Sequence, residues 1–155
     1  FYGDLLPKEM IGVPLGPPQR YLVVGSPAYL AERGTPQHPR ELSRHACIGY
    51  RLTPSHHYRW AFTEGKGSML EIEVTGSLTT STPALYLGAA EAGLGLAYCP
   101  EEEVSKQLAE GKLLRVLEPW CPTFVGFSLF YPSRHQLGKG LRALIDMLKA
   151  HYQTQ

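Results

Sequence analysis

The 155-residue chain lacks an excess of charge of either sign, because 15 Lys and Arg side chains stand against 14 Asp and Glu side chains. No stretch of the sequence groups the basic residues together. Proteins that bind nucleic acids neutralise phosphates with clustered Lys and Arg. The composition therefore argues against nucleic-acid binding by this chain.

Cysteine is scarce, since only Cys47, Cys99 and Cys121 occur and no two of them form a Cys-x-x-Cys pair. Such a pair is typical of zinc sites and thiol redox centres. We therefore expect reduced, buried thiols, no metal and no cofactor. The adjacent His56 and His57 point to opposite faces of any strand, and no third ligand is spaced to join them. We interpret these two histidines as part of a solvated loop.

Long apolar runs and a secretory signal are also missing. No run of 18 apolar residues occurs, and the start of the chain lacks the basic, apolar and small-residue zones of a signal peptide. A cytoplasmic location is the expectation that follows. The first residue is Phe1 rather than methionine, so we interpret the sequence as a piece of a longer protein.

The sequence shows no set of residues suited to catalysis. Catalysis needs a nucleophile beside a base, paired carboxylates or a metal cluster, held within hydrogen-bond reach. Cys99 and one of the six histidines could be combined on paper, but their spacing gives no reason for them to meet. A buried structural thiol is the simpler interpretation. We expect the protein not to be an enzyme.

Glycine and proline are plentiful instead, with 16 and 13 copies spread between apolar runs. Dispersed turn residues between apolar runs indicate a globular chain, and this length allows one domain or two small lobes. Strands that alternate with helices predict an α/β fold with a mainly parallel sheet. Strands are expected at 11–15, 21–25, 46–50, 94–98, 113–117 and 125–131, a hairpin at 59–74, and helices at 27–33, 83–92, 102–110 and from about 139.

The most informative stretch is a polar turn that leads from a strand into a helix. Pro83 suits the first helical position, Thr82 or Ser81 suits the N-cap, and Gly93 suits the left-handed residue that ends the helix. Backbone N–H groups and the macrodipole at such a helix start favour a bound anion or polar acceptor. The hydroxyls of Thr80, Ser81 and Thr82 lie beside it. The alternative is that these hydroxyls only cap the helix.

Four blocks of the sequence resemble the effector-binding domain of LysR-type transcriptional regulators. They are LVVGSPAYLA at 22–31, WAF at 60–62, GLGLAYCPE at 93–101 and FYPSR at 130–134. The resemblance covers essentially the whole chain, and the order and spacing of the blocks make it specific. It implies an α/β ligand-sensing domain with the fold of type 2 periplasmic binding proteins. A solute-binding protein of a transport system shares that fold and is the alternative.

The family's domain has two lobes joined by two crossing strands. By this resemblance, residues 21–131 form the second lobe, with the two hinge strands at its ends. Residues 1–20 and 132–155 are parts of the first lobe, which is incomplete in this chain. Family members place about half of that lobe, and a winged helix-turn-helix, before the position that matches Phe1. An incomplete lobe would leave apolar sheet surface exposed.

The resemblance implies that the effector binds in the cleft between the lobes. One side of the cleft would be the turn of Thr80, Ser81 and Thr82, and residues preceding Phe1 would line the other side. Three other candidates, a serine and two tyrosines, lie near the hinge strands. The alternative for the serine is an N-cap role, and the alternative for the tyrosines is a position in the core. The candidate effector-binding residues are Thr80, Ser81, Thr82, Ser26, Tyr98 and Tyr131.

Many relatives have Asn-Asp where this chain has Thr80-Ser81. Loss of that carboxylate removes a charge that repels anions, so we hypothesise an acidic effector such as a small carboxylate. The resemblance also implies that the domains assemble into homodimers or homotetramers. DNA would be contacted only through an N-terminal helix-turn-helix that is not in this sequence, and no membrane partner is expected.

Overall fold

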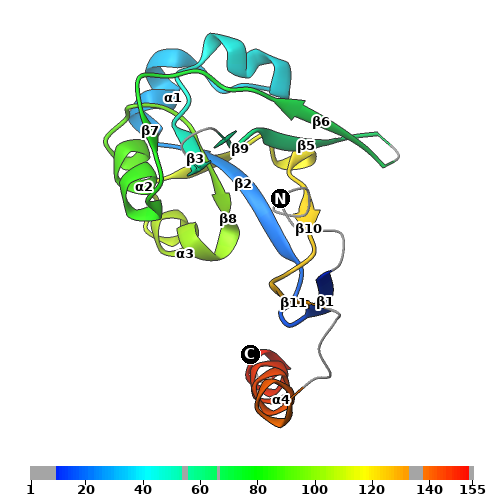
Figure 1. Cartoon of the computed structure of the whole chain (residues 1–155). Helices are drawn as coiled ribbons and strands as arrows, with labels where there is room; N and C mark the ends of the chain where they lie inside the picture. The colour runs from blue at the N-terminus through cyan, green and yellow to red at the C-terminus, as the bar shows by residue number, and fades with distance from the viewer. Residues whose placement is uncertain (1–9, 54–55, 66, 133–137, 154–155) are drawn as a thin grey trace. The chain divides into compact units, whose positions relative to one another are not determined.

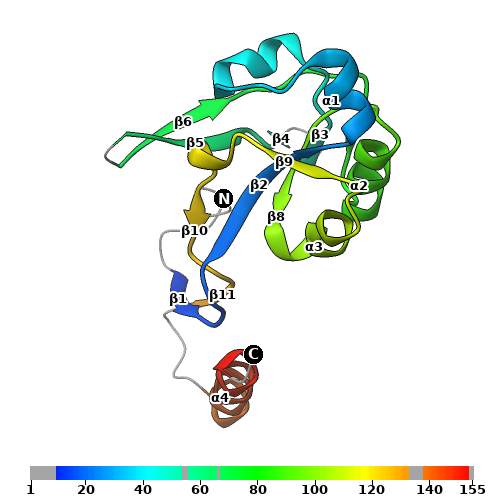
Figure 2. The same ribbon diagram turned by 180° about the vertical axis from the view of Figure 1, so that it is seen from behind.

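The structure is a computed structural model, and it describes residues 10–53, 56–65, 67–132 and 138–153. The chain divides into two compact units. The central unit is Arg20–Thr123, and the terminal unit combines Phe1–Gln19 with Phe124–Gln155. Figures 1 and 2 show the elements of both units from opposite sides. Each unit is described by itself.

The central unit holds most of the strands and helices. In chain order its elements are β2 (Gln19–Gly25), α1 (Pro27–Arg33), the 3-10 helix η2 (Pro39–Arg44), β3 (Gly49–Thr53), β4 (His56–His57), β5 (Trp60–Glu64), β6 (Ser68–Ile72), β7 (Thr79–Thr80), α2 (Pro83–Glu91), β8 (Ala97–Pro100), α3 (Glu101–Ala109), β9 (Leu114–Val116), the 3-10 helix η3 (Glu118–Trp120) and β10 (Thr123–Phe124).

Local sequence signals place the helices where they were predicted. Helix α1 begins with proline at its first position and ends at Gly34, which has a φ of 83°. Helix α2 likewise begins at Pro83 and is followed by Gly93 with a φ of 78°. Both glycines have a positive φ, which other residues rarely adopt. The predicted helix limits are therefore confirmed to within a residue or two.

The crossover from β7 through α2 to β8 connects segments that run in the same direction. Strand β7 pairs in parallel with β3, with Thr80 opposite Tyr50. Just before β3, Cys47 forms a parallel bridge to Leu96, which immediately precedes β8. The predicted strand-helix-strand crossover is confirmed, although β8 begins three residues later than expected.

The expectation of a mainly parallel sheet is wrong for β2. This strand lies between β8 and β9 and is antiparallel to both, so that Val24 faces Ala97 on one side and Arg115 on the other. Since β8 and β9 both oppose β2, they run in the same direction as each other, as the α3 crossover requires. A short helical turn is also predicted from the sequence at residues 40–43, and the 3-10 helix η2 confirms it.

Two further expectations for the central unit are resolved. The hairpin is confirmed, because β5 and β6 pair antiparallel from Trp60 opposite Ile72 to Glu64 opposite Ser68. The loop expected at the two histidines is wrong. His56 and His57 form the short strand β4, which pairs with β3 on the edge that β7 leaves open. Pairing satisfies backbone groups that this edge would otherwise leave exposed.

The core of the central unit has two apolar layers, separated by the alternation of side chains along its strands. Leu22 and Val24 of β2 pack with residues of α2 and α3, whereas Val23 between them packs with residues of α1 and the β5–β6 hairpin. All three cysteines are free thiols, as expected, but Cys121 is only half-buried rather than buried. Burial raises the pKa of Cys47 and of Cys99 to about 12, so both remain protonated near neutral pH.

The terminal unit contains strand β1 (Met10–Pro14), strand β11 (Ser128–Pro132) and helix α4 (Lys139–Gln153). Strands β1 and β11 are antiparallel. The backbone at Gly126 lies so close to the carbonyl of Pro17 that a side chain would not fit there. Large apolar side chains of this unit are exposed, and they are Ile11, Val125, Phe127, Phe130, Leu144 and Met147.

Candidate functional site

The predicted turn lies between the end of β7 and the start of α2. Thr80 ends the strand and is buried, and its hydroxyl oxygen accepts a hydrogen bond from the backbone N–H of Thr82 at 3.1 Å. Ser81 and Thr82 are exposed. One hydroxyl therefore shapes the turn, while the other two face solvent beside the helix start.

Thr82 occupies the N-cap of α2, but its side chain makes no capping hydrogen bond. The N–H groups of Leu85 and Tyr86 bond back to the carbonyl of Thr82, at 3.1 Å and 3.4 Å. The alternative that the hydroxyls serve only to cap the helix is therefore not supported at Thr82. The hydroxyl of Thr82 is therefore not used to cap α2 and can bond another molecule.

The charges around the helix starts strengthen this contrast. Helix α3 carries Glu101, Glu102 and Glu103 in its first turn, and these carboxylates compensate the positive end of its dipole. Helix α2 has no acidic residue in its first turn. Of the two helices, only α2 lacks a carboxylate in its own first turn, so its start favours a bound anion more strongly.

Ser26 lies at a different place from the turn. It is buried, it is the N-cap of α1, and its hydroxyl oxygen accepts a hydrogen bond from the N–H of Tyr29 at 3.2 Å. It lies close to Gly93, beyond the C-terminal end of α2. Helix α2 has nine residues and is about 13 Å long, so a small ligand would not touch both Ser26 and Thr82. A contact between Ser26 and an effector stays a prediction.

Tyr98 lies in the core of the central unit. Its hydroxyl donates a hydrogen bond to the carbonyl of Ala61 at 2.8 Å, and its ring stacks on Trp60 with the ring centres 5.4 Å apart. Burial raises the pKa of Tyr98 above its ordinary value. Tyr131 is half-buried on β11 of the terminal unit, opposite Ile11. Tyr98 therefore packs in the core, and Tyr131 lies in a strand pair. A contact between either tyrosine and an effector stays a prediction.

Comparison with known proteins decides the family. Residues 1–153 match the family model described as the LysR substrate binding domain. The chain belongs to this family. The resemblance found in the sequence is thereby confirmed.

Named relatives of this LysR substrate-binding domain are regulators of transcription rather than enzymes. A transcriptional regulator of Pseudomonas aeruginosa is 43% identical over 148 residues, which cover 95% of this chain and 48% of the relative. The HTH-type transcriptional regulator PgrR of Escherichia coli is 35% identical over 148 residues, covering 95% of this chain and 49% of the relative. The chain thus spans about half the length of the curated relatives it matches.

A solved structure agrees with the family assignment. The regulatory domain of CrgA, a LysR-type transcriptional regulator from Neisseria meningitidis, is 28% identical, with a TM-score of 0.68 over 94% of this chain and 70% of that one. The expected fold class, α/β with the architecture of type 2 periplasmic binding proteins, is confirmed. A solute-binding protein of transport is not favoured. The division of residues 1–20, 21–131 and 132–155 between two lobes stays a prediction.

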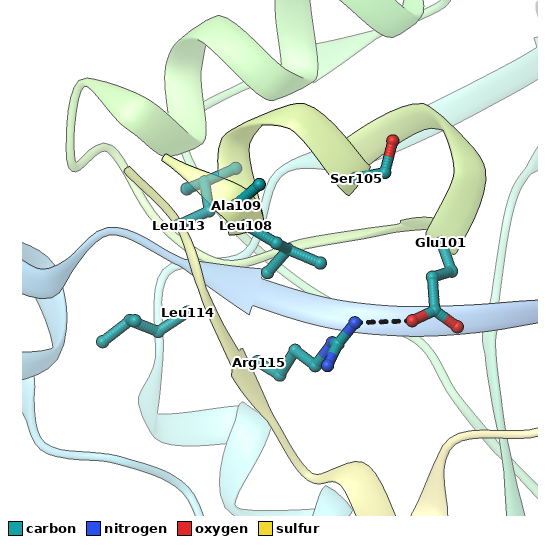
Figure 3. A pocket seen from close by; sticks show the side chains of 7 residues that line it. All are labelled: Glu101, Ser105, Leu108, Ala109, Leu113, Leu114 and Arg115. Carbon is teal, nitrogen blue, oxygen red and sulfur yellow. Dashed lines mark hydrogen bonds and ion pairs between the residues drawn. The ribbon is translucent and has the colours of Figure 1, made fainter. Parts of the chain in front are cut away.

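A separate hollow of about 490 Å³ lies between α3 and β9 (Figure 3). Its charged end is already neutralised, because the guanidinium of Arg115 bonds to the carboxylate of Glu101 at 2.6 Å. None of the residues predicted from the sequence lines it. The lining residues are Glu101, Ser105, Leu108, Ala109, Leu113, Leu114 and Arg115.

Neither a metal centre nor a membrane span is found in the part of the chain that the structure describes. In that part, no group of three or more His, Cys, Asp or Glu side chains is placed to hold a metal ion. None of its helices combines the length and the hydropathy needed to cross a bilayer.

Residues near the turn that the sequence analysis missed are Tyr50 and Tyr86. Tyr50 is the strand partner of Thr80, and the ring of Tyr86 meets that of Tyr50 edge to face. The expected strand at 46–50 did contain Tyr50. No local signal in the sequence shows that this strand pairs with the turn.

Proposed function

We propose that this chain is the ligand-sensing regulatory domain of a LysR-type transcriptional regulator, and that the turn of residues 80–82 with the start of α2 binds a small carboxylate. The family assignment supports the first part. The observation that carries the second is that α2 begins with neither a capping side chain nor an acidic residue. Both absences favour an anionic acceptor there.

The turn itself adds to the preference for an anion. The exposed hydroxyls of Ser81 and Thr82 can donate hydrogen bonds to a carboxylate. The burial of Thr80 and its bond to the Thr82 N–H give the turn a defined shape before a ligand arrives. A preformed turn lowers the ordering cost of binding.

In the complete protein, the effector would act by favouring one arrangement of the regulator over another. A ligand shifts such an equilibrium only by its difference in affinity for the two arrangements. We propose a homodimer or homotetramer that contacts DNA through an N-terminal helix-turn-helix. The protein is proposed not to be an enzyme.

The two parts of the proposal have separate tests. For the domain's role, the coding sequence upstream of Phe1 should encode a helix-turn-helix, whereas a secretory signal peptide there would support the transport alternative. For the site, a calorimetric titration of the complete protein with acetate, benzoate and their amides should show binding of the acids only. Preference for the neutral amides would contradict the carboxylate site.

A further inference from the structure

Helix α2 is anchored at its start by a side chain from its second turn. Tyr86 is 5% exposed, and its hydroxyl donates a hydrogen bond to the carboxylate of Glu103 on α3. Helices α2 and α3 lie side by side in both views (Figures 1 and 2). A bond to an ionised acceptor is stronger than a neutral one. The bond therefore ties the first two turns of α2 to a neighbouring helix.

The ring of Tyr86 also reaches the strand that enters the turn. It meets the ring of Tyr50 edge to face, with the ring centres 5.8 Å apart and the planes at 86°. Tyr50 is the parallel strand partner of Thr80. Tyr86 thus contacts both Tyr50, which is the strand partner of the turn, and Glu103 of α3. Such aromatic pairs have a preferred geometry and stabilise it.

We propose that Tyr86 and Glu103, together with Tyr50, are positioning residues that hold the start of α2 in the orientation needed to bind the effector. This inference rests on the proposed function. A helix start with its own cap would be held by that cap, but the cap of α2 makes no side-chain bond. The lateral anchor holds the helix through side chains and uses no backbone N–H group of its first turn.

The two partners of the bond are expected to respond differently to mutation. Tyr86→Phe removes the buried donor and leaves only the exposed Glu103 carboxylate, which water can solvate. Glu103→Ala instead leaves the buried hydroxyl of Tyr86 without its acceptor, which destabilises a folded protein more. Glu103→Gln keeps an acceptor oxygen at the same place and should rescue the anchor. Tyr86→Phe is therefore the cleaner test.

The first experiment measures amide hydrogen exchange of the complete protein. In Tyr86→Phe and in Glu103→Ala, amides 85–87 should exchange about tenfold faster than in the wild type, and Glu103→Gln should remain close to the wild type. Tyr29→Phe is the matched control, because it removes another buried hydroxyl, which accepts from the N–H of Ala46 on the other side of the sheet. Unchanged exchange at 85–87 in both variants, or an equal rise in the control, would overturn the anchor.

The second experiment titrates acetate while the amide resonances of residues 81–86 are followed by NMR. Tyr86→Phe should weaken acetate binding by about threefold or more, Glu103→Gln should restore it, and Tyr29→Phe should not change it. Equal affinity in the wild type and Tyr86→Phe would contradict the positioning role. If acetate does not shift these resonances even in the wild type, the carboxylate site itself fails, and the exchange experiment still decides whether Tyr86 anchors the helix.

Discussion

The substitution Ser81→Asp gives the most direct test of an anion site at the start of α2. It places a carboxylate in the exposed turn. The side chain of Ser81 is exposed, and the structure records no hydrogen bond from it within the turn. The mutation should therefore change charge without disturbing the packing.

The expected loss of affinity follows from Coulomb's law. Two like charges about 4 Å apart repel by about 1 kcal/mol in water and by about 4 kcal/mol at an effective dielectric constant of 20. Because Ser81 is exposed, the lower half of this range applies, about 1 to 2.5 kcal/mol, and the Kd for acetate should rise by about 5- to 70-fold. The difference should shrink at 1 M salt, where the Debye length is about 3 Å.

The same substitution should increase stability, because a negative charge near a helix N-terminus is favourable. An increase of about 0.3–1 kcal/mol in the free energy of unfolding is expected. Opposite effects on affinity and on stability separate loss of a site from partial unfolding. Calorimetric titration with acetate and urea denaturation measure the two quantities in the complete protein.

Ser43→Asp is the matched control, because it adds the same charge to another exposed serine. Ser43 lies on η2, which packs on the core layer that does not include α2. It should leave acetate binding unchanged. If Ser81→Asp binds acetate as tightly as the wild type at low salt, the reasoning is refuted. A loss of stability in Ser81→Asp would likewise show that the start of α2 does not carry the uncompensated dipole inferred from the structure.

Three further outcomes are expected. Ser26→Ala should lower the free energy of unfolding by about 1 kcal/mol because it removes the cap of α1, whereas Thr82→Ala should change it little because that side chain caps nothing; urea denaturation compares them. Tyr98→Phe should destabilise by about 1–3 kcal/mol, since the carbonyl of Ala61 loses its donor, and near-parity with the wild type in thermal unfolding would contradict this. Burial lowers the pKa of His45 below its ordinary value of 6.5, so the folded state binds fewer protons than the unfolded state; stability should be full above about pH 6.5 and fall as the pH drops below it, and His45→Gln should flatten the profile of unfolding free energy against pH.

The candidate site illustrates how far local sequence patterns reach. Proline at a first helical position and a hydroxyl residue before it locate the start of α2, because these preferences act within a single turn. The same pattern at α1 correctly offered Ser26 as a cap. The pattern could not show that the Ser26 hydroxyl caps its helix whereas the Thr82 hydroxyl does not, because that difference depends on how each helix packs.

The larger errors concern pairs of residues far apart in the chain. The antiparallel setting of β2 between β8 and β9 pairs residues 21–24 with residues 97–100, and residues 23–25 with residues 114–116. The bond of Tyr98 to Ala61 spans 37 positions, and that of Tyr86 to Glu103 spans 17. No periodicity within one segment encodes such a partner.

Thus the sequence by itself determined the helix limits, the alternating apolar strands and the family, because each depends on residues that are neighbours in the chain or on the order of its motifs. Only the tertiary structure decided that Tyr98 belongs to the core, that Ser26 lies at the far end of α2 from the turn, and that Tyr86 anchors the start of this helix. These outcomes depend on which elements pack together, and packing brings side chains from distant segments into contact.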